Sequence, residues 1–175
     1  GTPLTNEATV LPFIQAAQTI YRTECNINLI YTGTCIPTLT TPSEALVLSC
    51  DAGGFFADWW IAGSYYEFAS ATCGFEDGAR RVHGYGAEIM VFIIQNVTPD
   101  TPGNTIGCSM GPTHNYVVEE VGNLTGIAHE IGHSCGLWHQ NDPTNLMNPT
   151  VTSTGLTLKN WQRAIVRNSR HCVFL

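Results

Sequence analysis

The chain has 175 residues, of which 43% are hydrophobic and only 12% are charged, and its net charge is −7. This length and composition are typical of a single globular domain, and no apolar run is long enough to cross a bilayer. The positive charges are too few to form the basic surface that neutralises phosphates, so we expect no nucleic-acid partner. No basic and apolar leader is present at the start, so we expect any signal peptide or propeptide to have been removed.

Periodicity and turn residues predict most of the elements in chain order. Helical spacing of apolar residues predicts a first helix over residues 6–25. We assign no element to residues 53–86, which are rich in aromatics and glycine. Alternating or continuous apolar runs predict strands over residues 26–33, 45–50, 87–97 and 115–121, of which the third has the strongest signal and suits the middle of a sheet.

Two helices are predicted in the last third of the chain. One covers residues 123–135, with Asn123 as its N-terminal cap. The other begins near Thr157 and buries three apolar residues, namely Leu158, Trp161 and Ile165. Its basic residues recur every four positions and are interpreted as one solvated face of the helix, formed by Lys159, Arg163 and Arg167.

Seven cysteines are scattered along the chain without a C-x-x-C pair. This pattern is typical of disulfide-bonded proteins of oxidising compartments and predicts secretion, with buried free thiols as the alternative. The odd number leaves at least one cysteine without a partner in this chain. The pairs Cys25–Cys35 and Cys50–Cys73 fit local spacing, but the connectivity cannot be deduced from the sequence.

The segment HEIGHSCGLWH, residues 129–139, carries the strongest chemical signal. His129 and His133 are four residues apart, so on a helix their imidazoles lie on nearly the same side and can bind one zinc ion. Glu130 is rotated by about 100° from His129. It therefore flanks the metal instead of binding it, in the position of a general base for water.

The residues between and after these histidines have structural roles in this interpretation. Ile127, Ile131 and Cys135 lie on the opposite face and are expected to pack in the core, with a disulfide from Cys135 to Cys172 as one option. Gly136 is expected to end the helix because glycine adopts the left-handed conformation readily. The chain can then turn back and supply His139 as a third ligand, which leaves a fourth position open, as in catalytic zinc sites.

His129, Glu130, His133, Gly136 and His139, together with a downstream methionine, Met147, resemble the metzincin clan of zinc metallopeptidases. The interval from the third histidine to the methionine is most similar to that of the matrix metalloproteinases, although Gln140 and Asn148 depart from the best-known subfamilies. The resemblance implies an α+β fold: a twisted, mostly parallel sheet with an antiparallel edge strand, an active-site helix, and a small C-terminal subdomain ending in a helix.

The resemblance also implies roles for individual residues. Glu130 would be the catalytic base, and one catalytic zinc ion would be held by His129, His133 and His139. Met147 would form an apolar floor beneath the metal. The segment Pro149, Thr150, Val151 and Thr152 would form a wall of the substrate pocket, and an extended peptide would pair with a sheet edge near residues 107–113.

These observations predict a secreted, monomeric zinc endopeptidase in which residues 1–175 form one catalytic domain. The upper subdomain would comprise about residues 1–136 and the lower about 137–175. A zinc-binding or toxin-like module with little turnover is the alternative, and a zinc hydrolase acting on other bonds is a third interpretation. Isolated His83 and His114 are interpreted as surface residues, with binding of a second metal or of the substrate as the alternative. The sequence has no twelve-residue calcium loop, so calcium at scattered acids (Glu76, Asp77, Asp100) is unsupported.

Overall fold

The computed structural model describes residues 3–37, 40–50, 55–74, 86–98, 107–109, 111–113, 116–120 and 122–174. The expectations for His83, His114 and the scattered acids Glu76, Asp77 and Asp100 fall outside these residues, so they remain predictions.

The first predicted helix is confirmed as α1, which spans Glu7–Cys25. Asn6 caps it, because the Asn6 side chain accepts a hydrogen bond of 3.0 Å from the Thr9 backbone N–H. Asn26 ends it in the left-handed conformation with a φ of 54°. The prediction of a strand over residues 26–33 is wrong, because this segment pairs with no strand among the described residues. Instead, Ile27 and Leu29 pack against the core. Alternating apolar residues indicate that one side of an extended segment is buried. They do not show that its backbone pairs with another strand.

The strands form a mostly parallel arrangement with one antiparallel edge. Strand β5 (Tyr116–Glu119) lies between β2 (Met90–Ile93), which is parallel to it, and β4 (Gly107–Ser109), which is antiparallel. Strand β1 (Val47–Ser49) pairs in parallel with β3 (Asn96–Thr98). The predicted α+β architecture, with a mostly parallel sheet and an antiparallel edge strand, is therefore confirmed.

The strongest predicted strand, residues 87–97, is two strands in the structure. The chain leaves β2 after Ile93 and changes partners before β3, because the Ile94 N–H donates to Glu119 O and the Gln95 N–H donates to Leu46 O. A continuous apolar run predicts burial, whereas the choice of ladder partner depends on distant segments. The other strand predicted early in the chain, residues 45–50, begins as the short helix α2 (Ser43–Leu46) before β1.

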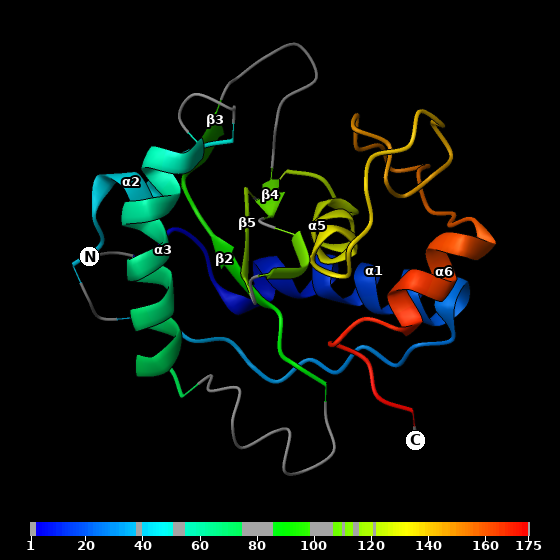
Figure 1. Cartoon of the computed structure of the whole chain (residues 1–175). Coiled ribbons are helices and arrows are strands. Elements are labelled where there is room, and N and C mark those ends of the chain that lie inside the picture. Colours follow the sequence, from blue (N-terminus) through cyan, green and yellow to red (C-terminus); the bar gives the residue numbers. More distant parts are fainter. Residues whose placement is uncertain are drawn as a thin grey trace.

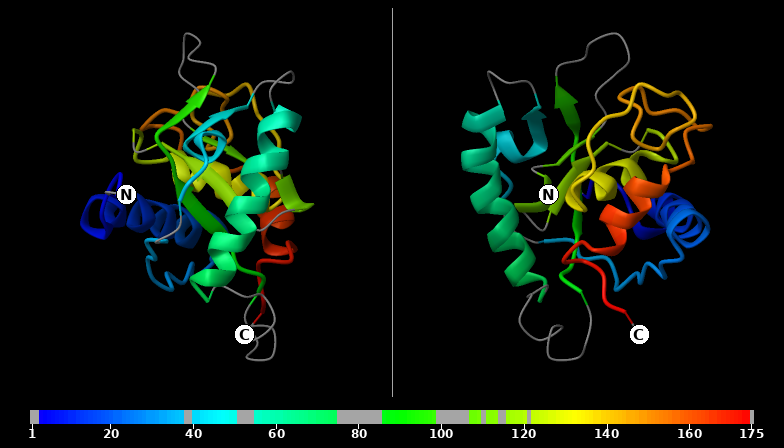
Figure 2. Two further views of the ribbon diagram at one scale, coloured as in Figure 1. Left: turned by 90° about the vertical axis from the view of Figure 1, so that its left-hand side faces the viewer. Right: turned by 45° about the vertical axis from the view of Figure 1, so that its right-hand side comes forward.

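Helices cover both faces of the strands. Figure 1 shows α3 (Phe55–Thr72) and α2 on one side and α1 and α5 (Gly126–Ser134) on the other, and Figure 2 shows the same layers from two further directions. Each side has its own cluster of buried apolar residues. One contains Tyr66 of α3 with Leu48 and Val97, and the other contains Ala17, Ile131 and Met147 around α1 and α5. A short 3-10 turn, η1 (Gly111–Thr113), lies between β4 and β5. None of the described helices has both the length and the apolar character needed to cross a membrane.

Two disulfides connect segments that are distant in sequence. Cys35 bonds to Cys73 at the end of α3, and Cys50, which follows β1, bonds to Cys108 in β4. The prediction of disulfides is confirmed, but the two local pairs that fit the spacing are wrong. The fold determines which cysteines lie close enough to form a disulfide, and their spacing along the chain does not indicate this. The remaining cysteines are free thiols, so the option of a Cys135–Cys172 disulfide is also not realised.

The last helix, α6 (Asn160–Arg167), is shorter than predicted and shows a different face to the core. Leu158 is buried as predicted, but Trp161 is 47% exposed and Ile165 is 39% exposed. The buried stripe of α6 consists of Gln162 and Val166 instead.

The basic residues of α6 are not simply solvated either. Arg163 forms an ion pair of 2.7 Å with Glu24, and Arg167 Nε donates to Cys25 O at 2.6 Å. These contacts attach α6 to the C-terminal end of α1, where the free carbonyls of a helix attract positive charge.

Candidate metal centre

Helix α5 carries the histidine motif and ends at the glycine that the sequence indicates. Its N-cap is Thr125, not Asn123 as predicted, because Asn123 Oδ1 accepts hydrogen bonds from the Thr125 N–H and hydroxyl instead. Gly136 has a φ of 95°, and the Leu137 N–H that follows donates to Gly132 O at 3.0 Å. This left-handed exit reverses the chain and returns residues 137–139 along the helix.

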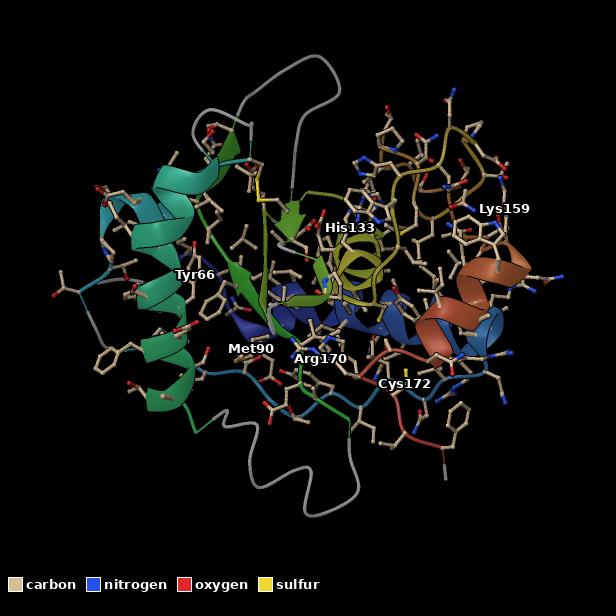
Figure 3. The ribbon with its side chains drawn as sticks, viewed as in Figure 1. Tyr66, Met90, His133, Lys159, Arg170 and Cys172 are labelled. Carbon is tan, nitrogen blue, oxygen red and sulfur yellow. A yellow bond between two sulfur atoms is a disulfide. The ribbon has the colours of Figure 1, made fainter. Side chains whose placement is uncertain are left out.

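The structure brings His129, His133 and His139 together. The Nε2 atom of His133 lies 3.1 Å from that of His129 and 3.1 Å from that of His139, and the Nε2 atoms of His129 and His139 are 3.3 Å apart. Figure 3 shows His133 near the end of α5, beside the segment that follows the helix. Tetrahedral zinc with zinc–nitrogen distances of 2.0–2.1 Å places its nitrogen ligands about 3.3 Å apart. The triad therefore has the size of a zinc site.

Hydrogen bonds determine which nitrogen of two of these rings faces inward. His129 Nδ1 lies 2.7 Å from Leu146 O, and His133 Nδ1 lies 2.8 Å from Leu137 O. A carbonyl can only accept, so both Nδ1 atoms carry the proton and both Nε2 atoms present a lone pair. Lone pairs that face one another at this distance repel unless a cation lies between them. This donor set fits zinc, and the carbonyls are the outer partners that orient metal-binding imidazoles.

The triad is also poor at binding protons. Burial lowers the pKa of His129 to about 3 and that of His133 to about 4, and burial also lowers the pKa of His139. The neutral imidazole is the form that binds a metal. At neutral pH a metal ion therefore has little competition from protons at these nitrogens.

Glu130 is adjacent to His129 in α5 and is only 4% exposed. Its Oε2 has no hydrogen-bond partner in the described part of the chain. Burial raises the pKa of Glu130 to about 8. A carboxyl group with a pKa near neutral is suited to accept and return a proton during a reaction.

The pKa of Glu130 makes a prediction for the metal-free protein. The folded value of about 8 lies above the unfolded value of about 4.3, so Glu130 stabilises the fold fully below about pH 4.3 and loses this contribution as the pH rises through about 8. Urea unfolding of the zinc-free protein should therefore give a free energy of unfolding that falls as the pH rises from about 6 to about 9, a range that brackets the raised pKa. Glu130→Gln should reduce this slope, and an unchanged slope would contradict the assignment.

Met147 lies under the histidine-bearing helix. It is fully buried, and a Cβ placed on Gly132 would be only 2.5 Å from Met147 Sδ and 3.4 Å from the Tyr21 hydroxyl. Tyr21 also donates to Ala128 O at 2.8 Å, which joins α1 to α5. Gly132 therefore allows the methionine to approach the helix backbone between the two histidines.

Gly132→Ala is expected to destabilise the fold by about 1–3 kcal/mol, because the added methyl group has no free space in a packed core. The matched control is Gly74→Ala, where a Cβ would meet nothing within 4 Å, although the positive φ of Gly74 adds local strain. Urea unfolding measures both variants. Equal stability of Gly132→Ala and the wild type would show that Met147 has room to move.

The turn that contains Met147 is held by two buried amides that the sequence analysis missed. Asn145 Nδ2 donates to Gln162 Oε1 at 2.8 Å, and Gln162 Nε2 donates back to Asn145 Oδ1 at 3.1 Å. Asn145 Oδ1 also accepts from the Met147 N–H at 3.0 Å. The only signal in the sequence is a polar residue two positions before the methionine, and nothing there indicates Gln162 as its partner.

The predicted pocket wall, residues 149–152, is attached to the loop before α5. Asn123 Nδ2 donates to Val151 O at 3.0 Å, and the Thr125 hydroxyl donates to Thr152 O at 3.1 Å. Pro149 and Thr150 are exposed, whereas Val151 and Thr152 are half-buried. The segment is thus a fixed wall beside α5, and no described contact tests its role in binding substrate.

Comparison with known proteins gives the family of this site. The sequence model of the matrixin family, peptidase family M10, matches residues 72–164, which is slightly more than half of the chain and includes all of the histidine motif and the methionine turn. The chain belongs to the matrixin family. The predicted resemblance to metzincin zinc metallopeptidases is confirmed, and the matched residues include the three histidines, Gly136 and Met147.

A solved structure extends the matrixin assignment to the fold. Metalloproteinase-II from Bacteroides fragilis aligns with a TM-score of 0.51 and 17% sequence identity, over 93% of this chain and 48% of that chain. At this identity the likeness concerns the fold alone. The matrixin chain thus spans about half the length of that protein. A search of curated protein sequences finds no match.

Proposed function

We propose that this matrixin chain is a secreted, zinc-dependent endopeptidase that hydrolyses peptide bonds with Glu130 as its general base. The convergence of three Nε2 atoms within 3.1–3.3 Å supports this proposal most directly, because two of them are held with their lone pairs inward by Nδ1–H donation to carbonyls. The two disulfides support an oxidising, extracellular location.

The residues divide the work as follows. His129, His133 and His139 would hold one zinc ion. Zinc, when bound, supplies Lewis acidity that polarises a carbonyl oxygen and lowers the pKa of water, and its positive charge favours the charged form of a nearby carboxylate. Glu130 accepts a proton from water as the water oxygen attacks the peptide carbonyl carbon. Glu130 then donates this proton to the amide nitrogen as the carbon–nitrogen bond breaks.

The surrounding segments would position the substrate. In this proposal, residues 149–152 form the wall beside the leaving side of the peptide, held by Asn123 and Thr125. Strand β4 lies at the antiparallel edge of its sheet, next to α5. An extended peptide can pair with such an edge, and this geometry leads us to place the substrate there.

The division of the chain is part of the same proposal. The upper subdomain comprises about residues 1–136 and the lower about residues 137–175, and the reversal at Gly136 supports a boundary there. We propose that one copy of the chain is sufficient for activity. The triad supports this, because all three of its histidines come from one chain.

A cleavage assay on an unfolded, reduced protein substrate tests the function. We expect cleavage by the zinc-loaded wild type, inhibition by a hydroxamate, loss with a chelator, and recovery when zinc is returned. The Glu130→Ala variant should bind zinc without cleaving. If the wild type binds zinc and cleaves nothing, the result favours a binding or toxin-like module. Equal cleavage by wild type and variant would contradict the proposed role of Glu130.

A further inference from the structure

Glu119 is a buried carboxyl group that the proposed mechanism does not use. It is the last residue of β5 and is only 1% exposed. Neither of its carboxyl oxygens has a hydrogen-bond partner in the described part of the chain. An unpartnered charge in this position would cost several kcal/mol. A group that is retained at such a cost needs an explanation other than packing.

Two glycines make the space for this carboxyl group. Gly107 in β4 is the direct cross-strand partner of Glu119, so the two positions face the same side of the sheet. A Cβ on Gly107 would overlap Glu119 Oε2, and a Cβ on Gly126 at the start of α5 would overlap Glu119 Oε1 and lie 2.8 Å from Cδ. The Glu119 carboxyl group therefore occupies a cradle between the edge of the sheet and the active-site helix.

Glu130 shares this cradle. The same Cβ position on Gly107 lies 2.8 Å from Glu130 Cγ and 3.0 Å from Glu130 Oε1. Glu130 is also the charged group with the largest effect on Glu119. The side chains of Glu119 and Glu130 therefore both reach the space beside Gly107, which a side chain at this position would fill.

The chemistry of the pair is complementary when Glu119 is neutral. Burial raises the pKa of Glu119 well above its usual range, with a further contribution from the negative charge of Glu130. A protonated carboxyl group has one O–H donor, whereas a carboxylate only accepts. A protonated Glu119 can therefore offer a hydrogen bond to the Glu130 carboxylate. Among the described residues, neither Glu119 oxygen nor Glu130 Oε2 has a hydrogen-bond partner. Two carboxyl groups that share a site in this way do not both ionise.

We propose that Glu119 is a positioning residue for Glu130, holding the side chain of the base from behind through a neutral carboxyl group seated between Gly107 and Gly126. This inference rests on the proposed function, because it assigns Glu119 a role only through Glu130. Glu119 does not touch the substrate. Its effect is to restrict the rotamers of Glu130, and preorganisation of this kind lowers the barrier to proton transfer.

Kinetics of three zinc-loaded variants test the proposal. Glu119→Met keeps a similar volume but removes the donor, and kcat should fall by about 10- to 100-fold with KM and zinc content unchanged, as for other partners that orient a functional group. Glu119→Gln keeps a donor of the same shape and should retain kcat near the wild-type value. Glu67→Gln removes an exposed carboxyl group from α3 and is the matched control.

Infrared spectroscopy supplies a measurement that does not depend on activity or on the folding of Glu119→Met. The zinc-loaded wild type should show a protonated carboxylic acid band that is absent from Glu119→Gln and present in Glu67→Gln. Absence of this band in the wild type would overturn the proposal, as would wild-type kcat in a folded Glu119→Met variant. A merely structural role would lower the stability of Glu119→Met while leaving its kcat unchanged. If the wild type binds zinc but cleaves nothing, the proposed function fails, and the positioning role fails with it.

Discussion

Replacing Glu130 by glutamine is expected to lower kcat/KM for peptide hydrolysis by about 100- to 10,000-fold, because a general base contributes a factor of this size. Glutamine has nearly the same shape but cannot accept the proton of the attacking water. Glu130 is buried in α5 and is not one of the three residues whose nitrogens converge. Zinc content should therefore remain one ion per chain, as we propose for the wild type.

The measurement combines initial rates on a peptide substrate with metal analysis of the same protein sample. Glu44→Gln is the control, because Glu44 is a half-buried carboxyl group in α2 on the other side of the sheet. It should leave kcat/KM unchanged. If Glu130→Gln retained the wild-type rate with zinc bound, another group would have to accept the proton, and the proposed mechanism would be wrong.

Replacing His129 by alanine is expected to weaken zinc binding by more than about 100-fold, since loss of a partner that only orients a ligand already costs about 10- to 100-fold. His129 is the most buried member of the triad and is 2% exposed. Its Nδ1–H donates to Leu146 O, directly before the methionine turn. The variant should lose peptide hydrolysis along with zinc, and added zinc should restore it only at much higher concentration.

Competition of each protein against a chromogenic chelator measures this affinity. His171→Ala is the matched control, because His171 is a half-buried histidine near the C-terminus and Nδ1 of its ring contacts Ala87 O, far from the triad in sequence. The control should bind zinc as tightly as the wild type. If the two variants bound zinc equally, the triad would not be the metal site.

The two departures from the best-known subfamilies have a structural explanation. Asn148 Nδ2 donates to Gln140 O at 3.4 Å, and Asn148 Oδ1 accepts from the Thr150 N–H at 2.9 Å. The Gln140 N–H in turn donates to Met147 O at 2.8 Å. Asn148 thus joins the segment that follows His139 to the start of residues 149–152. Both residues therefore take part in the hydrogen bonds that support the methionine turn.

Local spacing was sufficient to identify the candidate site. His129 and His133 lie one helical turn apart, Gly136 takes a conformation that few other residues adopt, and His139 follows at the distance that one reversal of the chain requires. These are properties of a short segment and depend little on the rest of the fold. Helix α1 was also predictable, because amphipathic spacing reports burial directly. The mostly parallel sheet with an antiparallel edge strand was expected only from the family resemblance.

Partners from distant segments were decided only by the tertiary structure. The disulfides Cys35–Cys73 and Cys50–Cys108, the amide pair of Asn145 with Gln162, and the cradle that Gly107 and Gly126 form around Glu119 each join residues whose separation along the chain carries no signal. Periodicity indicates which side of an element is buried, but it does not indicate what lies against it. Eleven consecutive residues were therefore enough to predict the metal-binding site, whereas the residues that hold this site in place are known only from how the chain packs.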